Sequence, residues 1–160
     1  MSEARNQQTY DRVTSFLAER HIDFSVQQHE PFDGSAQAAE VSGVDPSDAM
    51  KSILLRSIAT YALAVLPASE RIDSRKMRTV LGTSSLRFAT PEEVISVMEC
   101  TPGTCHPFGL IDDIPTFVDQ AMQLKPNWYF NAGLNTRTLS INYDDYVNVS
   151  GARIVDLIHQ

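Results

Sequence analysis

Apolar residues follow two different spacings along this chain of 160 residues. Alternating or short continuous apolar runs indicate β-strands, whereas apolar positions that recur on one helical face indicate helices. The last apolar segment, 154–158, fits neither spacing clearly. The expected strands are 22–27, 50–56, 61–66, 86–88, 116–118, 128–130 and 137–142, and the expected helices are 10–20, 35–42, 74–81, 91–98 and 144–147, with a further helical turn after Asp45.

Turn and cap residues separate these elements. Asp73 and Thr90 stand where N-caps are expected, and Glu93 completes a capping-box pattern with Thr90. Ser35 is expected to cap the helix that ends before Gly43. The short gap between 50–56 and 61–66 predicts a hairpin.

The balance of elements favours one fold class. Strands outnumber long helices, and neighbouring strands are close enough for hairpins, which favours α+β over a doubly wound fold. At 160 residues the chain is expected to be a single domain, residues 1–160. We therefore predict a mixed, largely antiparallel β-sheet flanked by short helices.

Charge and composition exclude some partners. Lys and Arg number 13 against 20 Asp and Glu, so the formal net charge is −7, which argues against a broad contact with DNA or RNA phosphates. It does not exclude binding the end of a nucleic acid. Residues 1–9 are polar, and no apolar run approaches the roughly 20 residues of a membrane helix. We expect a cytoplasmic protein without a membrane partner, in which Cys100 and Cys105 are free thiols.

The segment from Cys100 to Leu110, C-T-P-G-T-C-H-P-F-G-L, combines two prolines, two glycines and several apolar residues. Such a segment is rigid, irregular and partly buried. Its free backbone N–H groups could bind a carbonyl oxygen or an oxyanion. The alternative interpretation is a buried connection between a helix and a strand.

Individual side chains leave several kinds of chemistry open. Lys51 is either a lysine at a sheet edge or a cation at the mouth of a cleft. Asp119, at a strand end, is either a turn cap or a site residue. Cys105 beside His106 suggests a thiolate–imidazole pair, although adjacent residues in an extended chain point in opposite directions. A zinc site at Cys100, Cys105 and His106 lacks a C-x-x-C pair and a second cluster, and we expect neither metal nor cofactor.

Seven segments in a fixed order resemble a known family. They are H-E-P-F-D-G-S-A-Q-A-A-E from His29, A-M-K-S-I-L-L from Ala49, A-L-A-V-L-P-A from Ala62, L-R-F-A-T-P-E-E-V from Leu86, T-P-G-T-C-H-P-F-G-L from Thr101, F-V-D from Phe117, and F-N-A-G from Phe130 with the later S-I-N. Together they resemble the YbaK family, the freestanding relatives of the editing domain inserted in bacterial prolyl-tRNA synthetases. The standalone trans-editing subgroup is the most similar.

The resemblance implies an activity and a set of site residues. Members hydrolyse the ester of mischarged aminoacyl-tRNA, so the implied partners are the tRNA acceptor end and an aminoacyl-tRNA synthetase. Lys51 matches the family lysine, which by resemblance holds the terminal phosphate or ribose or orients the ester. Gly103 begins the G-x-x-x-P loop, whose backbone contacts the substrate and positions water. The remaining implied substrate-binding residues are His29, Ser35, Thr104, Cys105, His106, Pro107, Asp119, Asn131 and Gly133.

The Cys105–His106 pair departs from the small or apolar residues and proline that are common at these positions. We expect His106 either to project into the pocket and alter side-chain selection or to face solvent. The expected substrates carry Ser, Thr, Ala or Cys. Two alternatives stay open, a non-catalytic module that binds an aminoacyl-tRNA end or a synthetase, and a hydrolase that uses Cys105.

Overall fold

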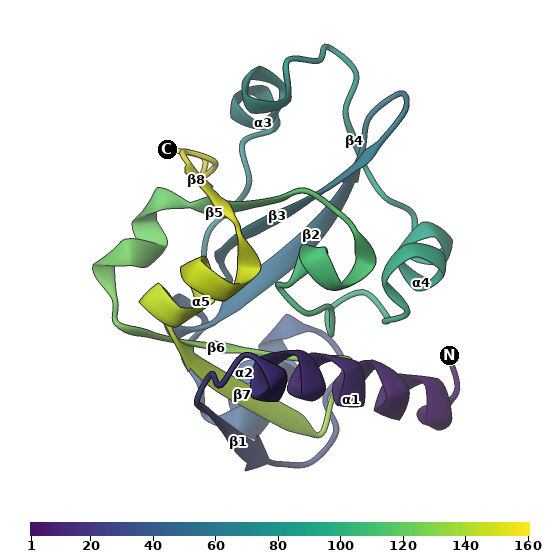
Figure 1. Ribbon diagram of the computed structural model, residues 1–160, viewed down its shortest axis with the longest axis vertical. Coiled ribbons are helices and arrows are strands. Elements are labelled where there is room, and N and C mark those ends of the chain that lie inside the picture. Colours follow the sequence, from purple (N-terminus) through teal and green to yellow (C-terminus); the bar gives the residue numbers. More distant parts are fainter.

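The computed structural model describes residues 1–160, except for the side chains of Ser35 and Ala36. Its strands form two sheets, one of five strands in the order β4-β2-β3-β5-β8 and one of three in the order β1-β7-β6 (Figure 1). The strands are β1 (Phe24–Gln28), β2 (Met50–Arg56), β3 (Tyr61–Pro67), β4 (Arg87–Phe88), β5 (Thr116–Asp119), β6 (Asn127–Phe130), β7 (Arg137–Asn142) and β8 (Arg153–Val155). The helices are α1 (Glu3–Glu19), α2 (Ser35–Ser42), α3 (Ser74–Leu81), α4 (Pro91–Met98) and α5 (Tyr143–Ser150), with 3₁₀ turns η1 (Pro46–Asp48), η2 (Gly109–Asp112) and η3 (Gln120–Leu124).

The predicted hairpin of β2 and β3 is confirmed and forms the centre of the larger sheet. The two strands are antiparallel, with Lys51 opposite Leu66, whereas β5 runs parallel to β3 and β8 runs parallel to β5. The α+β class is therefore confirmed. The strands divide into two sheets because β1, β7 and β6 pair with one another, and an isolated bridge between Ala49 and Tyr129 links them to the larger sheet.

Local capping chemistry places the helix ends as predicted. The side chain of Asp73 accepts a hydrogen bond from the N–H of Arg75 at the start of α3. Thr90 and Glu93 exchange both hydrogen bonds of a capping box at the start of α4. These side-chain acceptors satisfy N–H groups that a helix leaves unpaired in its first turn.

Several boundaries differ from the predictions. Helix α1 begins at Glu3, not at residue 10, because Ser2 caps a polar first turn that carries no apolar pattern. The N-cap of α2 is Gly34 and not Ser35. Helix α5 extends to Ser150. The strand predicted at 22–27 was expected to be half-buried, but Val26 of β1 is 44% exposed, because β1 lies at the edge of its sheet.

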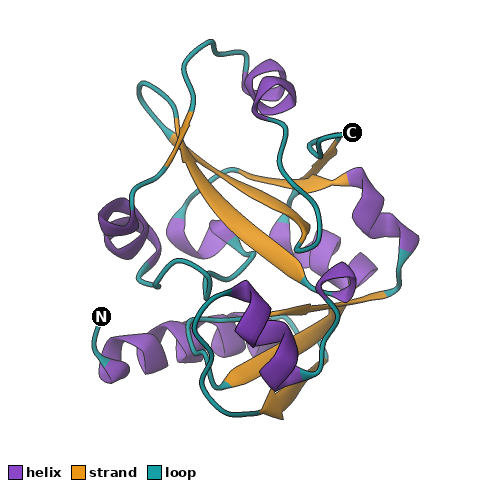
Figure 2. Ribbon diagram, turned by 180° about the vertical axis from the view of Figure 1, so that it is seen from behind, coloured by secondary structure: helices purple, strands orange, loops and turns teal.

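Helices α1 and α2 lie on opposite sides of the three-stranded sheet (Figures 1 and 2). The larger apolar core includes Val13 and Leu17 of α1 and the inward residues Leu139 and Ile141 of β7. A smaller core includes Met77 of α3, packed with residues of the five-stranded sheet. Since α1 fills one face of the small sheet, the polar face of β7 is left toward α2.

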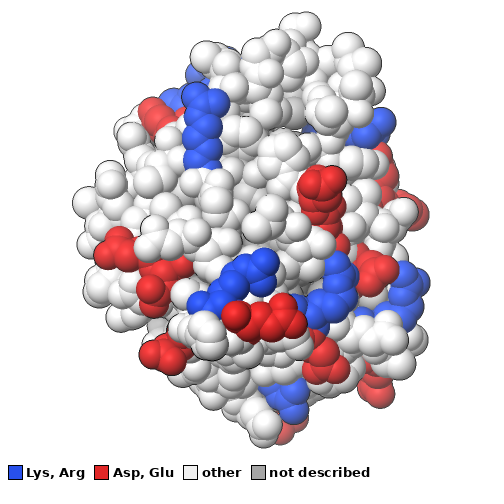
Figure 3. Space-filling model, in the orientation of Figure 1, with Lys and Arg blue, Asp and Glu red and all other residues white. Residues whose placement is uncertain are grey.

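Charged side chains are mixed over the surface drawn in Figure 3, where acidic and basic groups lie side by side over the region of α1. Within the part of the chain that the structure describes, no helix is both long enough and apolar enough to cross a bilayer.

Candidate functional site

A cavity of about 410 Å³ lies between α2, the start of β2, the loop before η2 and the polar face of the three-stranded sheet. Its volume lies within the usual range of small-ligand sites, roughly 300–1,000 Å³. The wall residues are Phe32, Asp33, Gly34, Ala38, Ala39, Ser42, Val44, Pro46, Ala49, Met50, Lys51, Ser52, Thr101, Pro102, Gly103, Thr104, Cys105, Tyr129, Phe130, Asn131, Asn135 and Thr138. Elements distant in the sequence thus converge on one cavity.

Lys51 is the cationic residue of the cavity wall. It is the second residue of β2, at the end of the strand nearest α2, and its side chain is partly buried. Burial lowers the pKa of its ammonium group below the ordinary value, while Glu70 opposes this shift and Arg71 adds to it. Lys51 forms no salt bridge with any residue that the structure describes. The geometry therefore favours the interpretation of Lys51 as a cation at the mouth of a cleft.

The loop that lines the cavity together with Lys51 contains backbone N–H groups without a backbone partner. Thr104 uses its own N–H and hydroxyl to donate to the carbonyl oxygen of Thr101, at 3.0 and 2.9 Å. Gly103 has φ +92°, a left-handed conformation that glycine adopts without a Cβ penalty. Among the described residues, the N–H groups of Gly103 and Cys105 find no backbone acceptor. These two N–H groups are candidates for the loop donors that the sequence predicts.

The two cysteines form a disulfide, Cys100–Cys105, with a Cα–Cα distance of 5.5 Å. The expectation of two free thiols is therefore wrong in this structure. The spacing of five residues allows the bridge because the chain turns back at Pro102 and Gly103. Cys105 lines the cavity as half of a disulfide and carries no thiolate, so a Cys105 nucleophile has no support.

His106 points neither into the cavity nor to solvent, and both expectations for its side chain are wrong. It is fully buried on the other side of the loop. Its Nδ1 accepts from the N–H of Phe108 at 3.2 Å, and its Nε2 lies 3.0 Å from Oδ2 of Asp112. Adjacent residues of the extended loop point to opposite sides, so Cys105 faces the cavity and His106 faces α1.

Pro107 and Gly133 support the loop from outside the cavity. The carbonyl oxygen of Pro107 accepts a hydrogen bond of 2.8 Å from the hydroxyl of Tyr146. The N–H of Gly133 donates to the carbonyl oxygen of Thr104 at 2.8 Å. Neither residue lines the cavity, so the structure corrects their assignment from substrate contacts to supports.

Asp119 is buried away from the cavity and acts as a cap. Its Oδ2 accepts from the N–H of Ala121 at 2.8 Å, and its Oδ1 accepts from the N–H of Leu157 at 2.7 Å. Of the two interpretations of this carboxylate, the turn cap is confirmed. Asn131 does line the cavity, and its amide donates to the carbonyl oxygen of Arg137 at 3.0 Å.

His29 stands behind the cavity wall. Its Nε2 lies 2.8 Å from Oγ1 of Thr138, and its Nδ1 lies 2.8 Å from the carbonyl oxygen of Glu30. Thr138 is itself a wall residue, so His29 orients the wall and does not line it. The side chain of Ser35 lies outside the described residues.

Sequence reasoning missed a set of wall residues from α2, the small sheet and the turn between β6 and β7, namely Ala38, Ala39, Asn135 and Thr138 among others. Thr138 belongs to the polar side of the alternation in 137–142, which would have indicated a residue facing away from the core. Ala38 and Ala39 give α2 small side chains toward the cavity. Among the described residues, no group of three or more His, Cys, Asp or Glu is arranged to hold a metal.

Comparison with known families gives one match over most of the chain. A family model described as an aminoacyl-tRNA editing domain matches residues 29–149. Helix α1 lies outside the matched residues.

Two curated relatives differ in how much of their length the chain spans. The proline–tRNA ligase of Bacillus licheniformis is 29% identical over 91 residues, which is 57% of this chain but 16% of the ligase. The multifunctional Ser/Thr-tRNA deacylase ProXp-y of Escherichia coli (strain K12) is 22% identical over 158 residues, covering 96% of this chain and 95% of that protein.

Two solved structures share the fold at low sequence identity. The hypothetical protein APE2540 superposes with a TM-score of 0.85 at 22% identity, over 92% of this chain and 99% of that chain. A protein described as a candidate trans-editing enzyme for prolyl tRNA synthetase superposes with a TM-score of 0.83 at 22% identity, over 100% of this chain and 99% of that chain.

Proposed function

Because the chain belongs to the aminoacyl-tRNA editing domain family, we propose that it is an aminoacyl-tRNA deacylase that acts in trans. Its substrate is the ester of a tRNA mischarged with a small amino acid, namely Ser, Thr, Ala or Cys. Residues 1–160 act as one deacylase domain. The observation that carries this proposal is one cavity lined both by Lys51, which has no salt bridge among the described residues, and by a loop with N–H groups that lack a backbone acceptor.

The ester is an activated bond, so its hydrolysis needs positioning and oxyanion stabilisation more than a strong nucleophile. In the proposed reaction the N–H groups of Gly103 and Cys105 receive the oxyanion that forms when water adds to the ester carbonyl. Lys51 holds the terminal phosphate or ribose through its positive charge. The neighbouring hydroxyl of the terminal ribose assists the attacking water, and the free amino acid and tRNA are released.

Few acid–base groups line the cavity, which supports the use of the substrate's own hydroxyl. Among the described wall residues, the side chains that titrate are Asp33, Lys51 and Tyr129. None of these is a histidine or a thiolate, which commonly activate nucleophiles. A substrate that supplies its own hydroxyl does not require one.

Selection by size follows from the walls of the cavity. Phe32, Met50 and Phe130 are large apolar residues of the wall, and each is nearly fully buried. Met50 and Phe130 belong to the larger apolar core and cannot recede without leaving it, so this wall would exclude a larger amino acid while a small one enters. This exclusion is the second sieve of an editing reaction.

The expected macromolecular partners follow from charge. With a net charge of −7 the protein is unsuited to a broad contact with the tRNA body. Recognition is therefore limited to the acceptor end of the tRNA, and no binding to DNA is expected. From the family we expect an aminoacyl-tRNA synthetase as a further partner. The tRNA and the synthetase would both be met in the cytoplasm, where we place the protein.

The same scarcity of acid–base groups favours one alternative, a non-catalytic module that binds an aminoacyl-tRNA end or a synthetase. Such a module would use Lys51 and the loop for binding alone. It would protect an aminoacyl-tRNA ester instead of cleaving it. Binding without turnover would distinguish it from the deacylase.

The test is hydrolysis of a panel of correctly charged and mischarged aminoacyl-tRNAs by the wild-type protein, Lys51→Ala and Lys76→Ala. Lys76 is a matched control because it lies on α3 and pairs with Asp156, outside the cavity wall. We expect turnover of a small-side-chain ester that is lost in Lys51→Ala and kept in Lys76→Ala. Turnover of no ester by the folded wild-type protein would refute the deacylase.

A further inference from the structure

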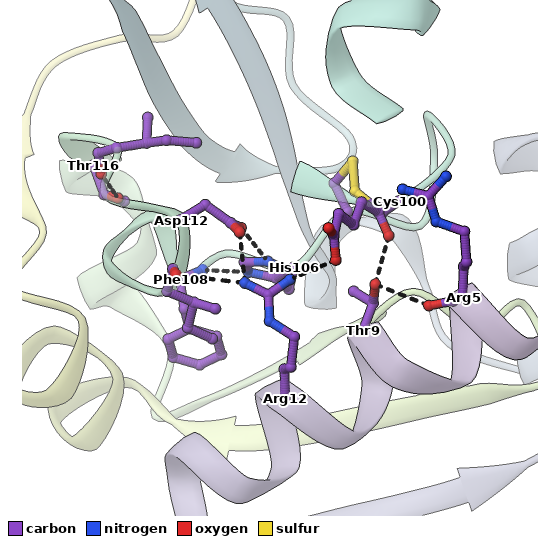
Figure 4. Close-up of polar contacts among 12 residues, drawn as sticks. Arg5, Thr9, Arg12, Cys100, His106, Phe108, Asp112 and Thr116 are labelled. Atoms are coloured by element: carbon purple, nitrogen blue, oxygen red, sulfur yellow. Dashed lines mark hydrogen bonds and ion pairs between the residues drawn. A yellow bond between two sulfur atoms is a disulfide. The ribbon is translucent and has the colours of Figure 1, made fainter. Parts of the chain in front are cut away.

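One guanidinium group on α1 reaches both ends of the loop that lines the cavity (Figure 4). Nη1 of Arg12 donates to Oε2 of Glu99 at 3.2 Å, and Nη2 donates to Oδ1 of Asp112 at 2.6 Å. Glu99 stands just before Cys100, where the loop starts, and Asp112 ends the 3₁₀ turn η2 that follows the loop. Arg12 therefore joins the entry of the loop to its exit.

The contact continues from Asp112 to the middle of the loop. Oδ2 of Asp112 lies 3.0 Å from Nε2 of His106, whose Nδ1 accepts the N–H of Phe108. Because Nδ1 is an acceptor, the proton of the neutral ring is on Nε2, which donates to the carboxylate. His106 directly follows Cys105, so the hydrogen bonds that fix its ring also fix the loop on the C-terminal side of Cys105.

The N-terminal end of the loop is also held by helix α1. Oγ1 of Thr9 donates to the carbonyl oxygen of Glu99 at 2.5 Å, and both Thr9 and His106 are fully buried (Figure 4). Glu99 itself has φ +55°, an uncommon backbone conformation for a residue with a side chain. Two bonds from α1 thus stabilise the turn that leads into the loop.

We propose that Arg12, acting through Asp112 and His106, is a positioning residue for ester hydrolysis. It sets the spacing of the Gly103 and Cys105 N–H groups relative to Lys51, and it touches no substrate because it lies outside the cavity wall. Asp112 is only 6% exposed at its side chain, so removal of its Arg12 partner leaves a carboxylate largely shielded from solvent. The proposal rests on the proposed deacylase function.

The experiment measures kcat and KM for the small-side-chain ester, at a temperature well below the unfolding midpoint of each variant. In Arg12→Met the cavity and Lys51 remain, but the loop donors are misplaced. Misplacement of reacting groups by about 1 Å can cost about 10²-fold in rate, so we expect kcat to fall by that order while KM changes little. Equal losses in kcat and kcat/KM identify an interaction made only in the transition state.

Two further variants separate positioning from general destabilisation. Arg12→Lys keeps the charge but lacks the planar fork that reaches both carboxylates, so it should restore kcat in part. Arg20→Met is the matched control, because Arg20 is the C-cap residue of the same helix and contacts Phe16, not the loop. It should leave kcat at the wild-type value.

A double-mutant cycle tests the route through the imidazole. Arg12→Met and His106→Gln act on one network, so the double variant should lose little more kcat than either single variant. The proposal is overturned if Arg12→Met turns over like Arg20→Met, or if the two losses multiply. A wild-type protein that hydrolyses no ester would overturn the positioning role of Arg12 by removing the proposed function itself. That result is distinct from the two outcomes for the variants.

Discussion

The N–H of Gly133 donates to the carbonyl oxygen of Thr104 across a distance of 2.8 Å and a sequence separation that spans two 3₁₀ turns and two strands. This bond fastens the N-A-G turn to the back of the cavity loop. Gly133 has φ +93°, and a Cβ placed there would lie 3.0 Å from Cβ of Thr9. The turn, the loop and α1 therefore meet at a place that only glycine fits.

Gly133→Ala should destabilise the protein and reduce turnover. A left-handed backbone costs a residue with a Cβ about 1–2 kcal/mol, and the close approach to Thr9 adds to this. The free energy of unfolding and kcat are the quantities to measure. Gly43→Ala is the matched control, since Gly43 has φ +73° with nothing within 4 Å of an added Cβ. A loss of stability in Gly133→Ala no larger than in Gly43→Ala would contradict the close approach to Thr9.

Reduction of the Cys100–Cys105 disulfide should also lower stability. Closing a loop of this size restricts the unfolded chain by an amount worth about 2 kcal/mol in the chain-entropy account. The midpoint of urea unfolding should therefore fall when a dithiol is added to the wild-type protein. The Cys100→Ser/Cys105→Ser variant should start at the lower midpoint and show no response to the dithiol. An unchanged wild-type midpoint would mean that the bridge does not form in solution.

Elements whose signals are local could be predicted from the sequence. The β2–β3 hairpin follows from two apolar runs and a short gap, and α4 follows from the Thr90–Glu93 capping box. The first turns of α1 carry no such signal, because their residues are polar and Thr9 is buried through tertiary contacts such as its hydrogen bond to Glu99. That contact joins residues 90 positions apart, which no local pattern reveals.

The candidate site, like the fold, could be predicted only in part. Lys51, Gly103, Thr104, Cys105 and Asn131 were expected at the site and do line the cavity. His106 was not placed correctly, because its direction depends on Asp112 and Arg12, and the latter is on a distant helix. The disulfide was missed for a similar reason, since two cysteines five apart pair only if the intervening chain turns back.

Asp119→Asn should reduce stability without reducing turnover. Each carboxylate oxygen of Asp119 accepts one backbone N–H, from Ala121 and from Leu157. An amide has a single acceptor oxygen, so one buried N–H would face an NH₂ group, at a cost of about 1–3 kcal/mol. Unfolding in urea and kcat measured on the same sample separate the two effects. A fall in kcat with unchanged stability would return Asp119 to the list of substrate contacts.

Lys51→Met should stabilise the protein while abolishing turnover. Burial lowers the pKa of Lys51 below 10.5, so the folded state binds this proton less tightly than the unfolded state does. The charged form therefore disfavours folding at neutral pH, and this penalty begins to fall as the pH rises through the lowered pKa and is gone above the ordinary value of 10.5. We expect the thermal midpoint of Lys51→Met to exceed that of the wild type at pH 7, with the gap narrowing at alkaline pH. Lys76→Met, which loses a salt bridge to Asp156, should show no such gain. If the wild-type protein were more stable than Lys51→Met at neutral pH, Lys51 would be stabilised by contacts within the fold and would not be left available for a substrate.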